Sequence, residues 1–188
     1  MGGAIANLSG PQTSGNKFTG TVKITNSIFD GNTSANGGAI WQGTDGETII
    51  EGSEFYNNKA IKTDHPAQQG GAITNASTMT IRNTIFQGNE AGMYGGAIAS
   101  VAPQGGNSYK PDLTLSDVTV TSNRAGQYGG GIYNARTNTL AFEGTNTITG
   151  NKSGTGEQEK DDDLYNLGTA NVNSGTTTVD VLYNNGEI

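Results

Sequence analysis

Gly37-Gly38-Ala39-Ile40 and Phe55-Tyr56-Asn57-Asn58 represent the two motifs that decide the fold of this chain, because both recur along it in alternation. The glycine motif appears as Gly-Gly-Ala-Ile at 2–5, 37–40, 70–73 and 95–98 and as Gly-Gly-Gly-Ile at 129–132. The second motif, Phe-x-x-Asn, begins at Phe29, Phe55 and Phe86, with weaker copies at Val120 and Ile148. Self-similarity at a period of a few tens of residues is the signature of a repeat architecture.

Short apolar strands with period-two alternation lie between the two motifs. Their inward residues are Val22 and Ile24, Ile50, Met79 and Ile81, Leu113 and Leu115, and Leu140 and Phe142. One turn-forming residue follows each strand, namely Asn26, Gly52, Asn83, Asp117 and Gly144. Asn, Asp and Gly are the residue types that accept a left-handed backbone, so these positions predict corners.

The shortest unit, 70–94, contains three predicted strands and three corners, and it is too small to bury its apolar side alone. Stacked copies can bury it, because each coil supplies a parallel partner for the next at about 4.7–4.9 Å. The sequence therefore predicts an all-β fold, a right-handed parallel β-helix (β-solenoid) of about five to six coils in one elongated domain.

Stacking turns equivalent residues into columns. We expect a core column of Ile40, Ile73, Ile98 and Ile132 and an aromatic core column of Phe29, Phe55 and Phe86. The Asn residues of the second motif should form a hydrogen-bonded ladder of Asn32, Asn58, Asn89, Asn123 and Asn151. A second inward polar column is expected at Asn7, Gln42, Asn75, Ser100 and Asn134.

The chain is interpreted as one β-helix segment, 1–188, of a longer protein. Clear repeats cover 2–151, and 152–188 is expected to be a degenerate last coil or a partial cap. Bare edge strands at 2–5 would allow end-to-end self-association of such rods.

Composition excludes several classes of function. The formal net charge of −7 and the thin spread of ten Lys and Arg argue against a nucleic-acid partner. There is no cysteine and no apolar run of membrane-spanning length. We expect no cofactor and no metal site.

The alternation of the two motifs over roughly 2–151 resembles the repeats of the polymorphic membrane proteins of chlamydiae. That resemblance implies a bacterial autotransporter passenger, exported to the outer-membrane surface or secreted, with an adhesive role toward a host-cell receptor or a glycan. Two alternatives remain: a carbohydrate-active β-helix enzyme, and a glycan-binding module without catalysis.

No catalytic residues are predicted. The carboxylates Asp30, Glu51, Glu54 and Asp117 fall in different columns, whereas polysaccharide cleavage needs them clustered. His65 is expected to be an ordinary residue of a surface insertion. The acidic run 157–163 could hold calcium, but a solvated acidic loop is the favoured interpretation because the run lacks calcium-loop spacing.

Aromatic side chains are the candidate ligand contacts. Tyr94 and Tyr128 each precede a Gly-Gly pair and should stack in adjacent coils, whereas Trp41 and Tyr133 should point outward. Tyr165 lies in a degraded copy of the same strand and should also point outward, but it is not one of these four candidate contacts. Such side chains can contact a sugar or fill a partner's pocket, or they can simply shield the backbone between coils.

Overall fold

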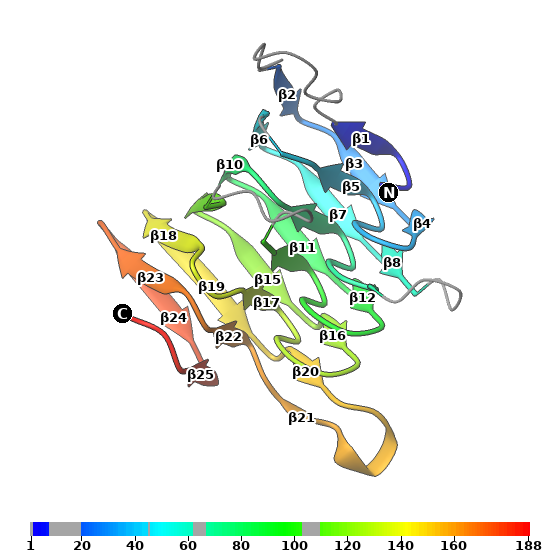
Figure 1. Ribbon diagram of the computed structural model, residues 1–188, viewed down its shortest axis with the longest axis vertical. Helices are drawn as coiled ribbons and strands as arrows, with labels where there is room; N and C mark the ends of the chain where they lie inside the picture. The colour runs from blue at the N-terminus through cyan, green and yellow to red at the C-terminus, as the bar shows by residue number, and fades with distance from the viewer. Residues whose placement is uncertain (1, 8–19, 45, 62–66, 103–109) are drawn as a thin grey trace.

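A computed structural model describes residues 2–7, 20–44, 46–61, 67–102 and 110–188. Its strands form four sheets, A to D, in which strands far apart in the sequence lie side by side along the long axis (Figure 1). Every strand pair is parallel except β20 with β21. This arrangement confirms the predicted all-β solenoid.

Each sheet takes one strand from each successive coil. Sheet A contains β1 (Ile5–Asn7), β5 (Ile40–Gln42), β9 (Ile73–Asn75), β13 (Ile98–Ser100), β17 (Ile132–Asn134), β22 (Leu164–Asn166) and β25 (Leu182–Asn184). Sheet B contains β2 (Thr21–Thr25), β6 (Glu47–Glu51), β10 (Thr78–Arg82), β14 (Asp112–Ser116), β18 (Thr139–Glu143) and β23 (Thr169–Val172). Sheet C contains β3 (Ile28–Asp30), β7 (Glu54–Tyr56), β11 (Ile85–Gln87), β15 (Thr119–Thr121), β19 (Thr145–Thr149) and β24 (Thr176–Val179).

Sheet D is the narrowest of the four. It contains β4 (Thr33–Ser34), β8 (Lys59–Ala60), β12 (Glu90–Ala91), β16 (Arg124–Ala125), β20 (Lys152–Ser153) and β21 (Lys160–Asp161). The prediction of three strands per coil was therefore wrong, since a coil has four. A two-residue strand is too short to show alternation, so the sequence pattern could not reveal it.

Within the described residues, five coils supply one strand to every sheet, and β22, β23 and β24 form a further partial coil. The register aligns like with like: Ile40 pairs with Ile73, Ile98 with both Ile73 and Ile132, and Phe55 with both Phe29 and Phe86. The rings of Phe29, Phe55 and Phe86 stack with centroids 4.7 and 4.8 Å apart. These columns fill one continuous core.

The predicted corners have the backbone that their residue types favour. Asn26, Gly52, Asn83, Asp117 and Gly144 all have positive φ, between 47° and 63°. The first and second glycine of a Gly-Gly pair serve different purposes. Gly37 has a φ of 57°, and a Cβ on Gly38 would lie 2.0 Å from the carbonyl oxygen of Gly71. The second glycine is therefore required by close coil-to-coil packing.

A ladder of buried amides runs through the coils between sheets C and D. The Nδ2 of Asn32, Asn58, Asn89 and Asn123 each donates to the Oδ1 of the next Asn of the column at 2.9 Å. The same Oδ1 atoms also accept a backbone N–H from the preceding coil, for example Asn58 N to Asn89 Oδ1 at 2.9 Å. The second Nδ2 hydrogen of Asn89 goes back to the carbonyl oxygen of Phe55. The amides of Asn58, Asn89 and Asn123 thus each join three neighbouring coils.

Asp163 occupies the next position after Asn151 in this ladder. Its Oδ1 accepts from both Nδ2 and the backbone N–H of Asn151, at 2.7 and 2.8 Å, and its Oδ2 accepts from the backbone N–H of Val181 at 3.0 Å. A carboxylate has no donor. The amide ladder therefore ends at Asp163, next to the β20–β21 hairpin that extends past the lower end of sheet D in Figure 1.

We predict that Asn89→Ala lowers the free energy of unfolding by at least about 3 kcal/mol, because it leaves the amide of Asn58 and the carbonyl of Phe55 unsatisfied in a buried site. Urea unfolding followed by circular dichroism measures the change. The control is Gln87→Ala on an exposed position of β11, expected within about 0.5 kcal/mol of the parent. Equal effects at the two positions would contradict a structural ladder.

We also predict that Asp163→Asn destabilises the chain by about 1–3 kcal/mol, because an amide nitrogen would then face the N–H of Val181 or of Asn151. The matched control is Asp161→Asn, which removes the same charge from an exposed position two residues away. A shift of the urea midpoint in the first variant but not in the second supports the assignment. A more stable Asp163→Asn variant would refute it.

Candidate functional site

The outer face of sheet A carries Trp41 and Tyr133, two of the four aromatic side chains that the sequence singled out. The middle residue of each sheet A strand points outward, and these residues form one file along the solenoid. In order of register the file contains Ala6, Trp41, Thr74, Ala99, Tyr133, Tyr165 and Tyr183. Tyr133 and Tyr165 are half-buried, whereas Tyr183 is 46% exposed. The three tyrosines therefore follow one another in three successive coils.

Two further tyrosines lie beside this file. Tyr94 and Tyr128 pair as an isolated parallel bridge just before β13 and β17. Their ring centroids are 5.9 Å apart with the planes 6° from parallel, as stacking in adjacent coils requires. Tyr94 also stacks on Tyr133 at 4.8 Å, and Tyr128 lies 4.6 Å from Tyr165.

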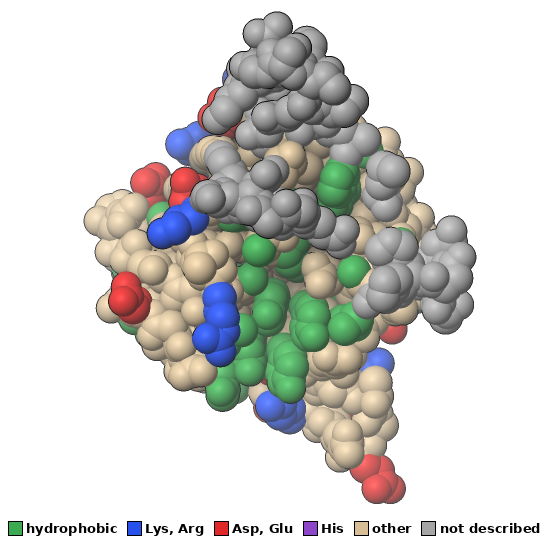
Figure 2. Space-filling view, in the orientation of Figure 1, with side chains coloured by type: hydrophobic (Ala, Val, Ile, Leu, Met, Phe, Trp, Pro, Cys, Tyr) green, Lys and Arg blue, Asp and Glu red, His purple; other side chains and the backbone are tan. Residues whose placement is uncertain are grey.

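Five rings thus form one connected group, which we call the tyrosine ladder: Tyr94, Tyr128, Tyr133, Tyr165 and Tyr183. The remaining contacts are Tyr133 with Tyr165 at 5.9 Å and Tyr165 with Tyr183 at 4.2 Å. In Figure 2, hydrophobic side chains, with tyrosine coloured among them, gather over the C-terminal strands of sheet A. The most exposed members are Tyr128, at 40%, and Tyr183.

Stacking decides which part of each ring a partner could reach. The rings lie face to face with their neighbours, so the π-faces inside the ladder are already covered. Their edges and hydroxyl groups remain for contact with solvent. A sugar that packs its C–H face on an aromatic ring needs an open π-face, so the interior of the ladder suits edge contacts and hydrogen bonds instead.

Trp41 lies apart from the tyrosine ladder. Thr74 and Ala99 separate it from Tyr133 in the outward file. The indole sits over Gly43, where an added Cβ would lie 3.0 Å from its Cη2 atom. Of the four predicted ligand contacts, the structure therefore brings Tyr94, Tyr128 and Tyr133 together and leaves Trp41 on its own.

Burial and mutual contact alter the acidity of the ladder. Burial, aided by a hydrogen bond with Tyr183, raises the pKa of Tyr165 to about 12. Burial also raises the pKa of Tyr133, although the nearby Arg136 opposes this. The phenols of Tyr133 and Tyr165 therefore stay protonated at neutral pH and can donate hydrogen bonds.

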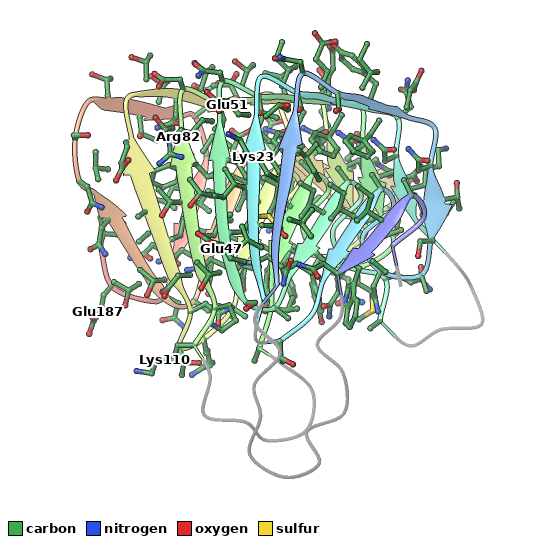
Figure 3. All side chains as sticks on the ribbon, turned by 90° about the horizontal axis from the view of Figure 1, so that it is seen from above. Lys23, Glu47, Glu51, Arg82, Lys110 and Glu187 are labelled. Carbon is green, nitrogen blue, oxygen red and sulfur yellow. The ribbon has the colours of Figure 1, made fainter. Side chains whose placement is uncertain are left out.

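The outer face of sheet B has a different character, since it carries charges of both signs. Figure 3 shows Lys23, Glu47, Glu51 and Arg82 on its strands, and the register places Glu51 directly beside Arg82. The hydroxyl of Thr21 donates to Glu47 at 3.2 Å. This face supplies a natural reference surface for tests of the tyrosine ladder.

The carboxylates considered for catalysis each have a local structural role. Asp30 accepts from the amide of Asn57 at 3.1 Å. Asp117 accepts the backbone N–H of Thr145 at 2.8 Å, and this bond is the main reason why its pKa is lowered. Glu54 is hydrogen-bonded to Tyr56 and raises the pKa of that phenol.

The acidic run 157–163 is exposed from Glu157 to Asp161, as the interpretation of a solvated loop expects. Its last two residues depart from that interpretation, because Asp162 is only 2% and Asp163 only 1% exposed. The backbone N–H of Gly129 donates to Asp162 Oδ2 at 2.9 Å. The charge of these residues suggested exposure to solvent. Asp162 and Asp163 instead accept hydrogen bonds from the preceding coil, in places where earlier coils use backbone carbonyl and side-chain amide oxygens.

The first half of the run forms the tip of the hairpin around the short helix η1 (Gly156–Gln158). Glu159 binds Arg124 at 2.8 Å and Lys152 at 3.4 Å, and the bond to Arg124 lowers the pKa of Glu159.

Among the described residues, no three His, Cys, Asp or Glu side chains gather as a metal would require. The same residues include no helix long and apolar enough to cross a membrane. His65 lies outside the described part of the chain.

Sequence reasoning missed one member of the ladder. Tyr183 follows Leu182 and precedes Asn184, as Tyr165 follows Leu164 and precedes Asn166, so the tripeptide repeat was the available signal. The contacts between Tyr94 and Tyr133 and between Tyr128 and Tyr165 could not be read from the repeat, because they join different columns.

Comparison with known proteins supports the resemblance seen in the motifs. Residues 26–42, 83–101 and 117–135 match the family model of the Chlamydia polymorphic membrane protein repeat. Each match runs from a corner residue through sheets C and D to a strand of sheet A. No curated protein and no solved structure matches the chain.

We predict that stability falls as pH rises from about 10 to 12, because unfolded tyrosine releases its proton near pH 10 whereas folded Tyr165 holds it until about 12. The unfolded state then binds fewer protons than the folded state, so alkali favours unfolding. Urea midpoints across this range should fall less steeply in Tyr165→Phe than in the parent. Parallel curves would contradict the shift.

Proposed function

We propose that this chain is a segment of a non-catalytic, adhesive β-solenoid that is displayed on a bacterial surface as an autotransporter passenger, because three of its segments match the family model of the Chlamydia polymorphic membrane protein repeat. In this proposal the parent protein holds the segment at the outer membrane or releases it. The partner is a host-cell receptor or a glycan.

The observation that carries the proposal is where the matched repeats lie. They contain the Asn ladder residues Asn32, Asn89 and Asn123 and the corners that precede them. These are the residues that stack one coil on the next, so the repeat encodes a rigid rod. A rod of this kind suits display, because insertions and surface side chains can vary while the stacking residues stay the same.

The tyrosine ladder and Trp41 are the contact surfaces that we propose for a partner. The ladder offers ring edges and hydroxyl groups in successive coils, which favours a protein receptor with matching hydrogen-bonding groups. Tyrosine contributes large contact area with little loss of side-chain entropy. Trp41 stands outside the stack, so a glycan that needs an open aromatic face would favour Trp41.

An enzyme acting on polysaccharides is the alternative from another class. It would need a carboxylate pair flanking the substrate, whereas Asp30, Glu54 and Asp117 are held in local hydrogen bonds. Incubation with acidic polysaccharides, followed by assay of unsaturated and reducing ends, tests this class directly. We expect no product.

We predict that beads coated with the protein bind cultured epithelial cells and that Tyr128→Ala reduces binding several-fold, because it removes one of the two most exposed rings of the tyrosine ladder. Flow cytometry of bead-bearing cells measures the effect. The matched control is Arg82→Ala on the outer face of sheet B, which should bind like the parent.

The glycan-binding alternative is tested separately, by comparing Trp41→Ala with the parent protein on a glycan array. Loss of an array signal in this variant, with cell binding retained, would assign glycan recognition to the indole. Circular dichroism and thermal melting of every variant guard against loss of fold. Cell binding that is unchanged in both Tyr128→Ala and Trp41→Ala would overturn the assignment of these surfaces.

A further inference from the structure

A second file of polar side chains points inward from sheet A. It contains Asn7, Gln42, Asn75, Ser100, Asn134, Asn166 and Asn184 in successive coils, and the five from Gln42 to Asn166 are fully buried. Three of the adjacent amide pairs are joined by a bond toward the next coil: Asn7 to Gln42 at 2.8 Å, Asn134 to Asn166 at 2.8 Å, and Asn166 to Asn184 at 2.7 Å. In the pair of Gln42 and Asn75, the Nε2 of Gln42 donates instead to the carbonyl oxygen of Gly43.

Ser100 interrupts this file directly before Asn134. A serine hydroxyl is shorter than a carboxamide, and it has no amide nitrogen to reach the Oδ1 of Asn134 in the next coil. That Oδ1 is buried and has no hydrogen-bond partner, and the Oδ1 of the buried neighbour Asn138 has none either. A buried unpaired acceptor is costly, at about 1–3 kcal/mol.

The unpaired hydrogen-bond donors and acceptors near Ser100 define which molecule could bind there. The Nδ2 of Asn138 donates to Ser100 Oγ at 3.2 Å, so the serine oxygen already serves as an acceptor. Its hydroxyl proton is then available for another group. The site therefore has one donor and two acceptors to satisfy. A water molecule, which accepts from a donor and has two O–H groups to give, fits this set.

We propose that one water molecule is bound inside the solenoid at Ser100. It accepts the hydroxyl proton of Ser100 and donates to the Oδ1 atoms of Asn134 and Asn138. Three polar partners are typical of a buried structural water. A cation fits less well, because the three groups named are one hydroxyl donor and two neutral amides, and none of them is a carboxylate.

The proposed water replaces the amide that the file lacks in this coil. It links the coil of Ser100 to the coil of Asn134, as the amide of Asn134 links its own coil to that of Asn166. This role is independent of any partner that the outer surface binds, so it does not rest on the proposed function.

The first test is a crystal structure of the protein at a resolution that shows ordered internal water. One density peak is expected within about 2.7–3.2 Å of Ser100 Oγ, Asn134 Oδ1 and Asn138 Oδ1. A site without density, or direct bonding of these three side chains to one another, would overturn the proposal.

The second test counts long-lived water in solution by water relaxation dispersion. Ser100→Asn supplies the missing amide nitrogen, and we expect it to lose one long-lived water relative to the parent. The control is Thr114→Ser on the outer face of sheet B, which should keep the parent's number. An unchanged count in a folded Ser100→Asn variant would overturn the proposal, and the crystal structure of the parent decides the matter if that variant fails to fold.

Discussion

The parallel, in-register stacking of coils is the constraint on which every other feature of this structure depends. Neighbouring coils place equivalent residues about 4.7–4.9 Å apart, and a side chain that recurs in a column must be able to contact a copy of itself at that distance. Phenylalanine rings meet the condition by stacking face to face, and branched apolar residues meet it by packing. A buried asparagine meets it because the amide carries both a donor and an acceptor.

This constraint explains why so much of the fold follows from the sequence. Repetition of Ile40, Phe55 and Asn58 in successive units states directly which residues align, so the register, the core columns and the corners could be derived from spacing alone. Where the chain departs from repetition, the derivation fails. The two-residue strands of sheet D carry too little pattern, and Asp163 replaces an Asn of the ladder after a hairpin instead of after a full coil.

The candidate site could be predicted only in part, for a related reason. Tyr133 and Tyr165 follow from the repeat because they share a column, and Tyr94 and Tyr128 follow because each precedes a glycine pair. The contacts between the two columns depend on side-chain directions that repetition does not specify. Stacking also changes the chemistry expected of these residues, since rings that would be open on an isolated strand cover each other here.

The direct succession of identical bonds in the Asn ladder has an evolutionary consequence. Asn58, Asn89 and Asn123 each accept a hydrogen bond from the preceding Asn and donate one to the next side chain of the ladder. None of these bonds therefore depends on which coil of the stack the residue belongs to. Duplication or deletion of a whole unit between Asn32 and Asn151 would leave every bond type intact, including the final one to Asp163. Related genes can therefore differ in length by multiples of one coil while the hydrogen bonding of the interior is preserved.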